Sequence, residues 1–164
     1  MPEAVVQKLI TRDQLYALME CKDGTYNLIG EGFTDLSESK GAKEYTRKYV
    51  HNKTERTDVI GFAPSISYSA DIISGDPVIA EIVDITDNEK LGADAQRNIV
   101  IVNGWEPGQT SGSFPAYQRK YSVVPDSKGS GTEALIYTGT FKACGDMIKG
   151  SWSAETKKFT PATE

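Results

Sequence analysis

The chain of 164 residues has a mass of 17.9 kDa, which fits one domain able to bury a core without a metal or disulfide. Its 18 basic and 23 acidic side chains give a net charge of −5. This charge argues against a surface that binds nucleic acid and, more weakly, against binding to an anionic membrane. No apolar stretch approaches the ~18 residues of a membrane-spanning helix, and the start lacks a signal-peptide layout. We therefore expect a protein that is kept in a cytoplasm or built into something assembled there.

Short segments between frequent turn signals open the chain. Residues 15–21 and 25–29 flank Asp23-Gly24, a pair that tolerates the positive φ angles of tight turns, so they predict a β-hairpin. A third strand is expected over 33–39, with Leu36 pointing inward.

The clearest alternation covers residues 64–72. With a period of two, one face carries Ile66, Tyr68, Ala70 and Ile72, and the other carries Ser65, Ser67, Ser69 and Asp71. We expect the apolar face to lie in a core and the polar face to meet solvent or a polar cavity.

Residues 40–61 interrupt this pattern with charges of both signs and few apolar side chains. The segment is too polar to be held by its own burial, and a long structureless loop in a compact domain is uncommon unless it is functional. We expect a long, protruding charged loop.

One helix is predicted over residues 76–91. Asp76 can cap its free amides, and Pro77 suits the first turn. An apolar stripe follows one side, and Gly92 is a plausible stop. The stripe consists of Val78, Ile79, Ile82, Val83 and Ile85.

The remainder of the chain is again strand-like. Residues 98–102 predict a buried central strand, and 103–114 a glycine-rich loop. Residues 116–124 and 132–143 predict strands that flank turn chemistry at 125–131. A strand over 147–152 precedes a tail or final edge strand. The pattern predicts a mainly β protein, a β-sandwich or small barrel with one packed helix.

Enzyme chemistry has little to use in this sequence. Cys21 and Cys144 lie in separate apolar-patterned segments with no second Cys or His near either, which favours small buried hydrophobes. His51 is the only histidine, and no nucleophile motif accompanies it. The glycines of 104–112 lack a phosphate-loop ending, and residues 84–89 lack calcium-loop spacing. We predict no enzyme, no metal and no cofactor.

Several of these stretches resemble the tail tube (major tail) proteins of long-tailed bacteriophages. The resemblance is carried by the opening hairpin at 18–30, the run 34–39, the charged link 47–53, the alternating row 65–71, the helix start at 75–78, and residues 129–139 with 145–146. It extends from about Leu15 to Trp152, and it brings no active-site residues.

The resemblance implies a β-sandwich with a side helix, six copies to a ring, and rings stacked into a hollow tube that carries DNA. It implies a place in the virion tail, assembled in the host cytoplasm. The implied partners are further copies of the chain, tail terminator, baseplate or tail-tip proteins and a tape measure protein, with no membrane. The domain would span 14–153, between an N-terminal arm (1–13) and a C-terminal tail (154–164).

Two surfaces become candidates for assembly. The polar row is expected to face the tube lumen, because a weakly anionic lining repels DNA where a basic lining would hold it; its residues are Ser65, Ser67, Ser69 and Asp71. The charged segment is expected to contact a neighbouring subunit, with a plain exposed loop as the alternative. The residues assigned to this contact are Lys43, Glu44, Arg47, Lys48, His51, Lys53, Glu55, Arg56 and Asp58.

Three other functions stay open from the residues. The chain could form the inner tube of a contractile phage-like particle or secretion device. It could be a small sugar- or peptide-binding β-sandwich, for which Trp105, Phe114 and Tyr117 would form an exposed aromatic cluster. A hydrolase is the third, and it lacks a visible nucleophile–base pair.

Overall fold

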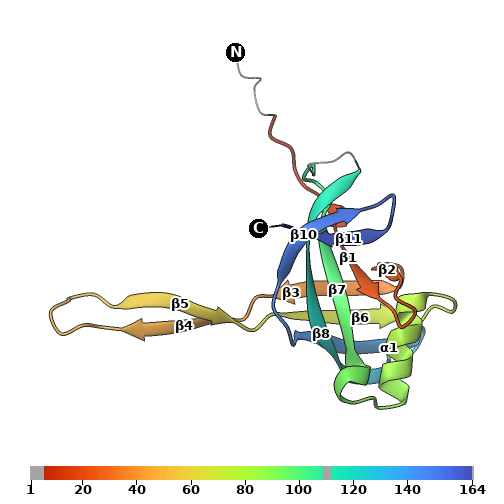
Figure 1. The fold of residues 1–164 in the computed structure, drawn as a ribbon. Coiled ribbons are helices and arrows are strands. Elements are labelled where there is room, and N and C mark those ends of the chain that lie inside the picture. Colours follow the sequence, from red (N-terminus) through yellow and green to blue (C-terminus); the bar gives the residue numbers. More distant parts are fainter. Residues whose placement is uncertain (1–5, 109–111, 164) are drawn as a thin grey trace.

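The computed structural model describes residues 6–108 and 112–163, and it is mainly β (Figure 1). One nine-stranded sheet forms the body, a separate two-stranded sheet projects from it, and a single α-helix packs against the body. The strands are β1 (Leu15–Glu20), β2 (Tyr26–Ile29), β3 (Phe33–Ser39), β4 (Ala42–Arg47), β5 (Arg56–Phe62), β6 (Ser65–Asp71), β7 (Gln96–Asn103), β8 (Ser113–Ser130), β9 (Ile136–Ala143), β10 (Ile148–Ser153) and β11 (Lys158–Pro161). The helix α1 is Pro77–Asp87, and short 3-10 turns cover Arg12–Gln14 and Gly92–Ala95.

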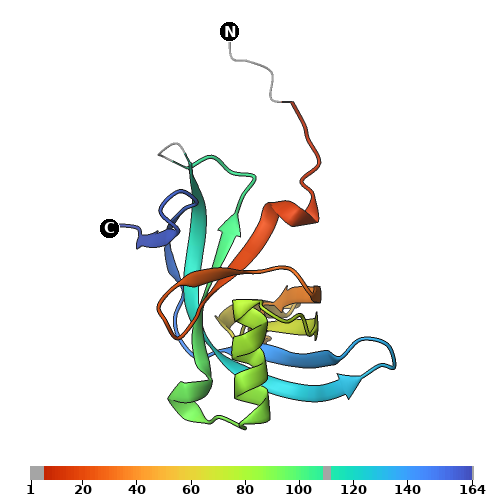
Figure 2. The ribbon, with the colours of Figure 1, turned by 90° about the vertical axis from the view of Figure 1, so that its right-hand side faces the viewer.

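The body sheet curls into a half-barrel because one long strand serves two neighbours. Its order is β2-β1-β7-β8-β9-β6-β3, and all of its pairs are antiparallel. The second half of β8 pairs with β9, whereas its first half pairs with β10, which in turn pairs with β11. The β10–β11 hairpin therefore branches from the sheet at one end (Figure 2). The predicted fold class, a β-sandwich or small barrel with one packed helix, is confirmed.

Two hydrophobic clusters lie on opposite faces of this sheet. The larger one fills the concave side, where Ile99 and Ile101 of β7 meet the helix and β6. The smaller one contains Val100 and Val102 on the other face, together with Trp152 of β10. Both faces of β7 are thus buried, which explains why residues 99–102 form a continuous apolar run in the sequence.

The helix is fastened to the sheet by its cap, its apolar stripe and its acids. The Asp76 carboxylate accepts hydrogen bonds from the backbone amides of Val78 and Ile79, as predicted. On the opposite side, acids pair with bases from the body: Glu81 with Arg97 at 2.8 Å, Asp84 with Lys22 and Lys90, and Asp87 with Lys128. The buried apolar stripe and the buried Glu81–Arg97 pair hold a helix rich in β-branched residues whose intrinsic helix propensity is low, whereas the exposed pairs contribute little.

Several predicted elements are confirmed, and others end elsewhere. The opening hairpin forms with Gly24 at φ +82°, and residues 96–103 form the central strand. The helix ends at Asp87, four residues before the predicted end, because Asn88 already caps it. The tail is partly ordered, since β11 forms an edge strand beside β10.

The predicted turn at 125–131 is wrong. β8 continues to Ser130, and shifts in its register after Pro125 and after Lys128 absorb the turn-forming residues as irregularities within the strand. The chain reverses only afterwards, at 131–135, and this displacement leaves Leu135 exposed, whereas Tyr137 and Phe141 of β9 are buried.

Titration at alkaline pH should show how deeply the tyrosines of the larger core cluster are buried. Burial raises the pKa of Tyr68 and that of Tyr121 to about 12, from 10.0. Because the folded pKa exceeds the unfolded one, their contribution to stability is complete below pH 10 and is lost as the pH rises toward 12. We expect a late phase in the tyrosine absorbance titration near pH 12 that shrinks in Tyr68→Phe and in Tyr121→Phe. A late phase unchanged in both variants would contradict this packing.

Candidate assembly surfaces

Residues 40–62 form an arm that projects from the body (Figure 1). β4 and β5 pair only with each other, as a two-stranded sheet separate from the body sheet. The segment is therefore a β-hairpin and not the irregular loop that was expected. Charged side chains on both strands conceal its alternation in the sequence, whereas the cross-strand pair Thr46–Thr57, with hydroxyls 2.9 Å apart, shows the register.

One face of the arm is ionic and aromatic. The Arg47 guanidinium forms an ion pair with Asp58, which also lies 3.3 Å from Arg56. The same guanidinium lies over the rings of Tyr45, at 4.9 Å, and Tyr49, at 5.4 Å. The hydrogen bond from Arg47 lowers the pKa of Asp58. These three predicted contact residues are thus tied to one another within the arm.

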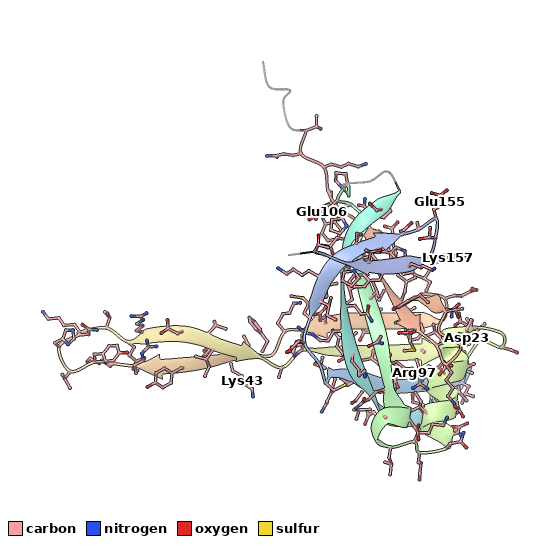
Figure 3. The ribbon with its side chains drawn as sticks, viewed as in Figure 1. Asp23, Lys43, Arg97, Glu106, Glu155 and Lys157 are labelled. Carbon is pink, nitrogen blue, oxygen red and sulfur yellow. The ribbon has the colours of Figure 1, made fainter. Side chains whose placement is uncertain are left out.

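The arm also exposes an unusual amount of apolar surface. Val59 and Ile60 are 57% and 66% exposed, and Val50 at the tip is fully exposed. Side chains project from both faces of the hairpin along its length (Figure 3). Exposed apolar surface of this extent is typical of interaction sites. The large hydrophobic residues exposed on the arm are Tyr45, Tyr49, Val50, Val59, Ile60 and Phe62.

The arm and the body carry opposite charges. Residues 40–62 hold six Lys or Arg and three Asp or Glu, a net charge of +3, so the rest of the chain carries −8 of the total of −5. The tip, residues 47–56, holds four of these bases and only one acid, Glu55. An arm of this kind is electrostatically complementary to an acidic surface.

The root of the arm is fixed in direction. Glu38 of β3 accepts hydrogen bonds from Lys40, at 2.6 Å, and from the Tyr117 hydroxyl of β8, at 3.1 Å across the barrel. Gly41 has φ +57°, and a Cβ there would collide with the carbonyl oxygen of Ala63 on the returning strand. Only glycine fits this crossing, so the arm leaves the body at a defined place.

The predicted polar row is part of a wider hydroxyl-rich face. On β6, Ile66, Tyr68 and Ala70 are buried, while the residues between them are exposed or half-buried. Because directly opposed residues in antiparallel strands share a face, the row extends onto both neighbouring strands. Ser65 faces Ser39 and Lys142, Ser67 faces Ser37 and Thr140, and Ser69 faces Asp35 and Thr138.

This Ser/Thr face occupies the outer side of the half-barrel over β3, β6 and β9. The concave side of the same strands faces the larger core cluster. The outer side of β1, β7 and the start of β8 is covered by β10, through Trp152. The outer side of the sheet therefore has two regions. One is packed against β10, and the other is not covered by any described element and carries mainly small side chains with little charge.

The remaining residues singled out by the sequence do not converge on a site. Cys21 is buried, as predicted, but Cys144 is exposed because it follows the end of β9. His51 is exposed at the arm tip. The proposed aromatic cluster does not form, because Phe114 packs against the smaller cluster and Tyr117 against the larger one, on opposite faces of β8.

Within the described ranges, no group of three His, Cys, Asp or Glu side chains is placed to hold a metal ion. The same residues contain no helix long and apolar enough to cross a membrane.

Comparisons with known proteins place the fold. No family model and no curated protein matches the sequence. Among solved structures, a chain of the anti-feeding prophage cap is similar, with 16% identity and a TM-score of 0.53, covering 93% of this chain and 97% of that one. A chain of the anti-feeding prophage baseplate is similar with 12% identity and a TM-score of 0.51, and the match covers 88% of this chain and 97% of that one. A chain from the sheath/tube terminator of an extracellular contractile injection system, PVC, is similar with 15% identity and a TM-score of 0.51. This match covers 88% of this chain and 99% of that one.

The chain thus has a fold found in components of contractile phage-like particles, and it shares this fold over most of its length. The similarity agrees with the resemblance to phage tail proteins at the level of a phage-tail-like fold.

Proposed function

We propose that the protein is a structural subunit of a phage tail tube, with six copies in a ring and rings stacked into a hollow tube in the virion tail. The observation that carries this proposal is the uncovered Ser/Thr face over β3, β6 and β9, on strands whose other face is packed against the larger core cluster. A tube subunit needs a sheet with a packed face and a second face that can line a lumen. The phage-tail-like fold supports the same role.

The chemistry of the Ser/Thr face suits a conduit for DNA. The hydroxyls of Ser65, Ser67 and Ser69 offer no cation to the phosphates, and the two acids of the face, Asp35 and Asp71, outweigh Lys142, the base opposite Ser65. A basic lining would bind the duplex through phosphate contacts and counterion release. Like-charge repulsion from an acidic body lets DNA slide.

The arm supplies the contact between subunits. Its net positive charge and exposed apolar side chains match the acidic body of a neighbouring copy. Lys43, Lys48 and Lys53 form no ion pair within the part of the chain that the structure describes, so they are available for this contact. Tail terminator, baseplate or tail-tip and tape measure proteins are the further partners in this proposal.

The inner tube of a contractile particle is the second candidate function. It is favoured by the similarity to chains of two contractile systems, the anti-feeding prophage and PVC. Particles purified with this protein would contain a contractile sheath in that case, and none in the case of a non-contractile tail.

The introduction of positive charge on the Ser/Thr face tests the conduit. Ser67→Lys with Ser69→Lys should leave the fold and the rings intact, because both side chains lie on the outer side of β6, but should slow DNA ejection since each lysine can contact a phosphate. Ser67→Asn with Ser69→Asn is the control for bulk without charge, and it should eject DNA normally. Ejection at the normal rate from the lysine variant would contradict a lumen-facing role.

A further inference from the structure

An apolar groove runs along the seam where the half-barrel fails to close. β2 and β3 are the two end strands of the sheet order, and a groove of about 740 Å³ lies between β3 and the β1–β2 hairpin. Leu15, Leu28, Phe33 and Leu36 provide its apolar lining, and the exposed carboxylate of Asp35 stands beside them. A groove with this lining is shaped for an extended apolar segment.

β3 presents to this seam a backbone edge that no other described strand covers. Its other edge is hydrogen-bonded to β6. The Arg12 guanidinium donates to the carbonyl oxygen of Leu36 at 2.8 Å and to that of Leu15 at 2.6 Å, so one side chain bridges the seam. Backbone groups of alternate residues point to the same edge of an antiparallel strand, so those of Glu38 face the seam as well. Such an edge is a template for an added strand.

The chain carries a segment whose chemistry matches the groove. Residues 6–11 lead away from the body in both views (Figures 1 and 2). Val6 and Leu9 are 84% and 85% exposed, and Ile10 is 48% exposed. The only charged residue of the segment is Lys8, opposite in sign to Asp35. Since Arg12 lines the groove, the segment starts beside its own groove but points away from it.

We propose that residues 6–11 of a second copy lie in this groove and pair with β3 as an additional strand. Backbone hydrogen bonds to the free edge would supply affinity, and the apolar side chains would fill the groove. Lys8 would approach Asp35 and select the direction of the incoming strand. This inference rests on the self-assembly in the proposed function, and it identifies what covers the exposed edge.

Cross-linking between two variants, each with one exposed cysteine besides the buried Cys21, tests the contact. In a Cys144→Ser background, which removes the exposed thiol, Leu9→Cys is placed in one preparation and Ser37→Cys in another with a different tag. After mixing, a short bis-maleimide should give a covalent dimer containing one copy of each variant. Thr156→Cys, in the exposed β10–β11 turn, replaces Ser37→Cys as the control and should lose this dimer.

Two outcomes would overturn the proposal. One is a mixture that yields no more mixed dimer than the Thr156→Cys control. The other is a chain carrying both Leu9→Cys and Ser37→Cys that links only within itself, because the segment would then fold back into its own groove. A mixed dimer from a protein that never forms hollow rings would contradict the tube function but support this contact. Hollow rings without the mixed dimer would support the tube function but contradict this contact.

Discussion

Replacing residues 42–62 with a short Gly-Ser linker should leave a folded protein that no longer assembles. The arm contributes no residue to either core cluster, and its ends are joined by a hydrogen bond from the Ala63 amide to the Gly41 carbonyl at 3.0 Å. A short linker can therefore close the gap without disturbing β3 or β6. The loss of the basic, apolar arm removes the proposed contact with the neighbouring copy.

Microscopy of the armless variant beside a thermal melt separates the possibilities. Normal tubes from this variant would exclude the arm as the assembly contact, and an unfolded product would show that the arm belongs to the core. Lys48→Glu with Lys53→Glu is the matched control for charge, since it keeps the hairpin. This variant should assemble more weakly. Assembly of the natural protein should also weaken as the salt concentration rises above ~0.1 M, where charges more than ~10 Å apart are screened from each other.

Glu81→Ala should destabilise the fold by about 3–5 kcal/mol, because it leaves a buried charge without its partner. The Glu81–Arg97 pair has side chains only 13% and 8% exposed, and Arg97 lies on the central strand β7. Glu81 accepts from two guanidinium nitrogens of Arg97, at 3.0 and 2.8 Å. The substitution would therefore remove the ion pair between α1 and β7, and it would leave the buried Arg97 guanidinium without a carboxylate partner.

Lys22→Ala is the control for this substitution. Lys22 also ties the helix to the body, through Asp84, but its side chain is 55% exposed, so its loss should cost at most about 1 kcal/mol. Urea unfolding of both variants measures the difference. Equal, small effects would show that the buried pair does not fasten the helix.

The sequence predicts those elements whose signals are local. The period of two in 65–71, the Asp76 cap and the Asp23-Gly24 turn each act within a few residues, and all three have their expected structure. Strand pairing decides the remainder. The turn chemistry of 125–131 is overridden because β9 pairs with β8 as far as Ser130.

The candidate surfaces follow the same division. The polar row could be predicted, but its extension onto β3 and β9 depends on registers such as Ser37–Ser67 that join residues 30 positions apart and more. The arm's charges could be predicted, whereas its hairpin form was hidden because both of its faces are exposed and carry no core signal. The seam could not be predicted, since it depends on which two strands end the sheet.

Electron microscopy of the purified protein at high concentration is the most direct test of whether this chain is a tube subunit. We expect hollow six-fold rings or stacked tubes, with the Ser/Thr face of β3, β6 and β9 lining the lumen and the arms between neighbouring subunits. A protein that stays strictly monomeric across concentration and salt, or a tube in which this face points outward, would contradict this function.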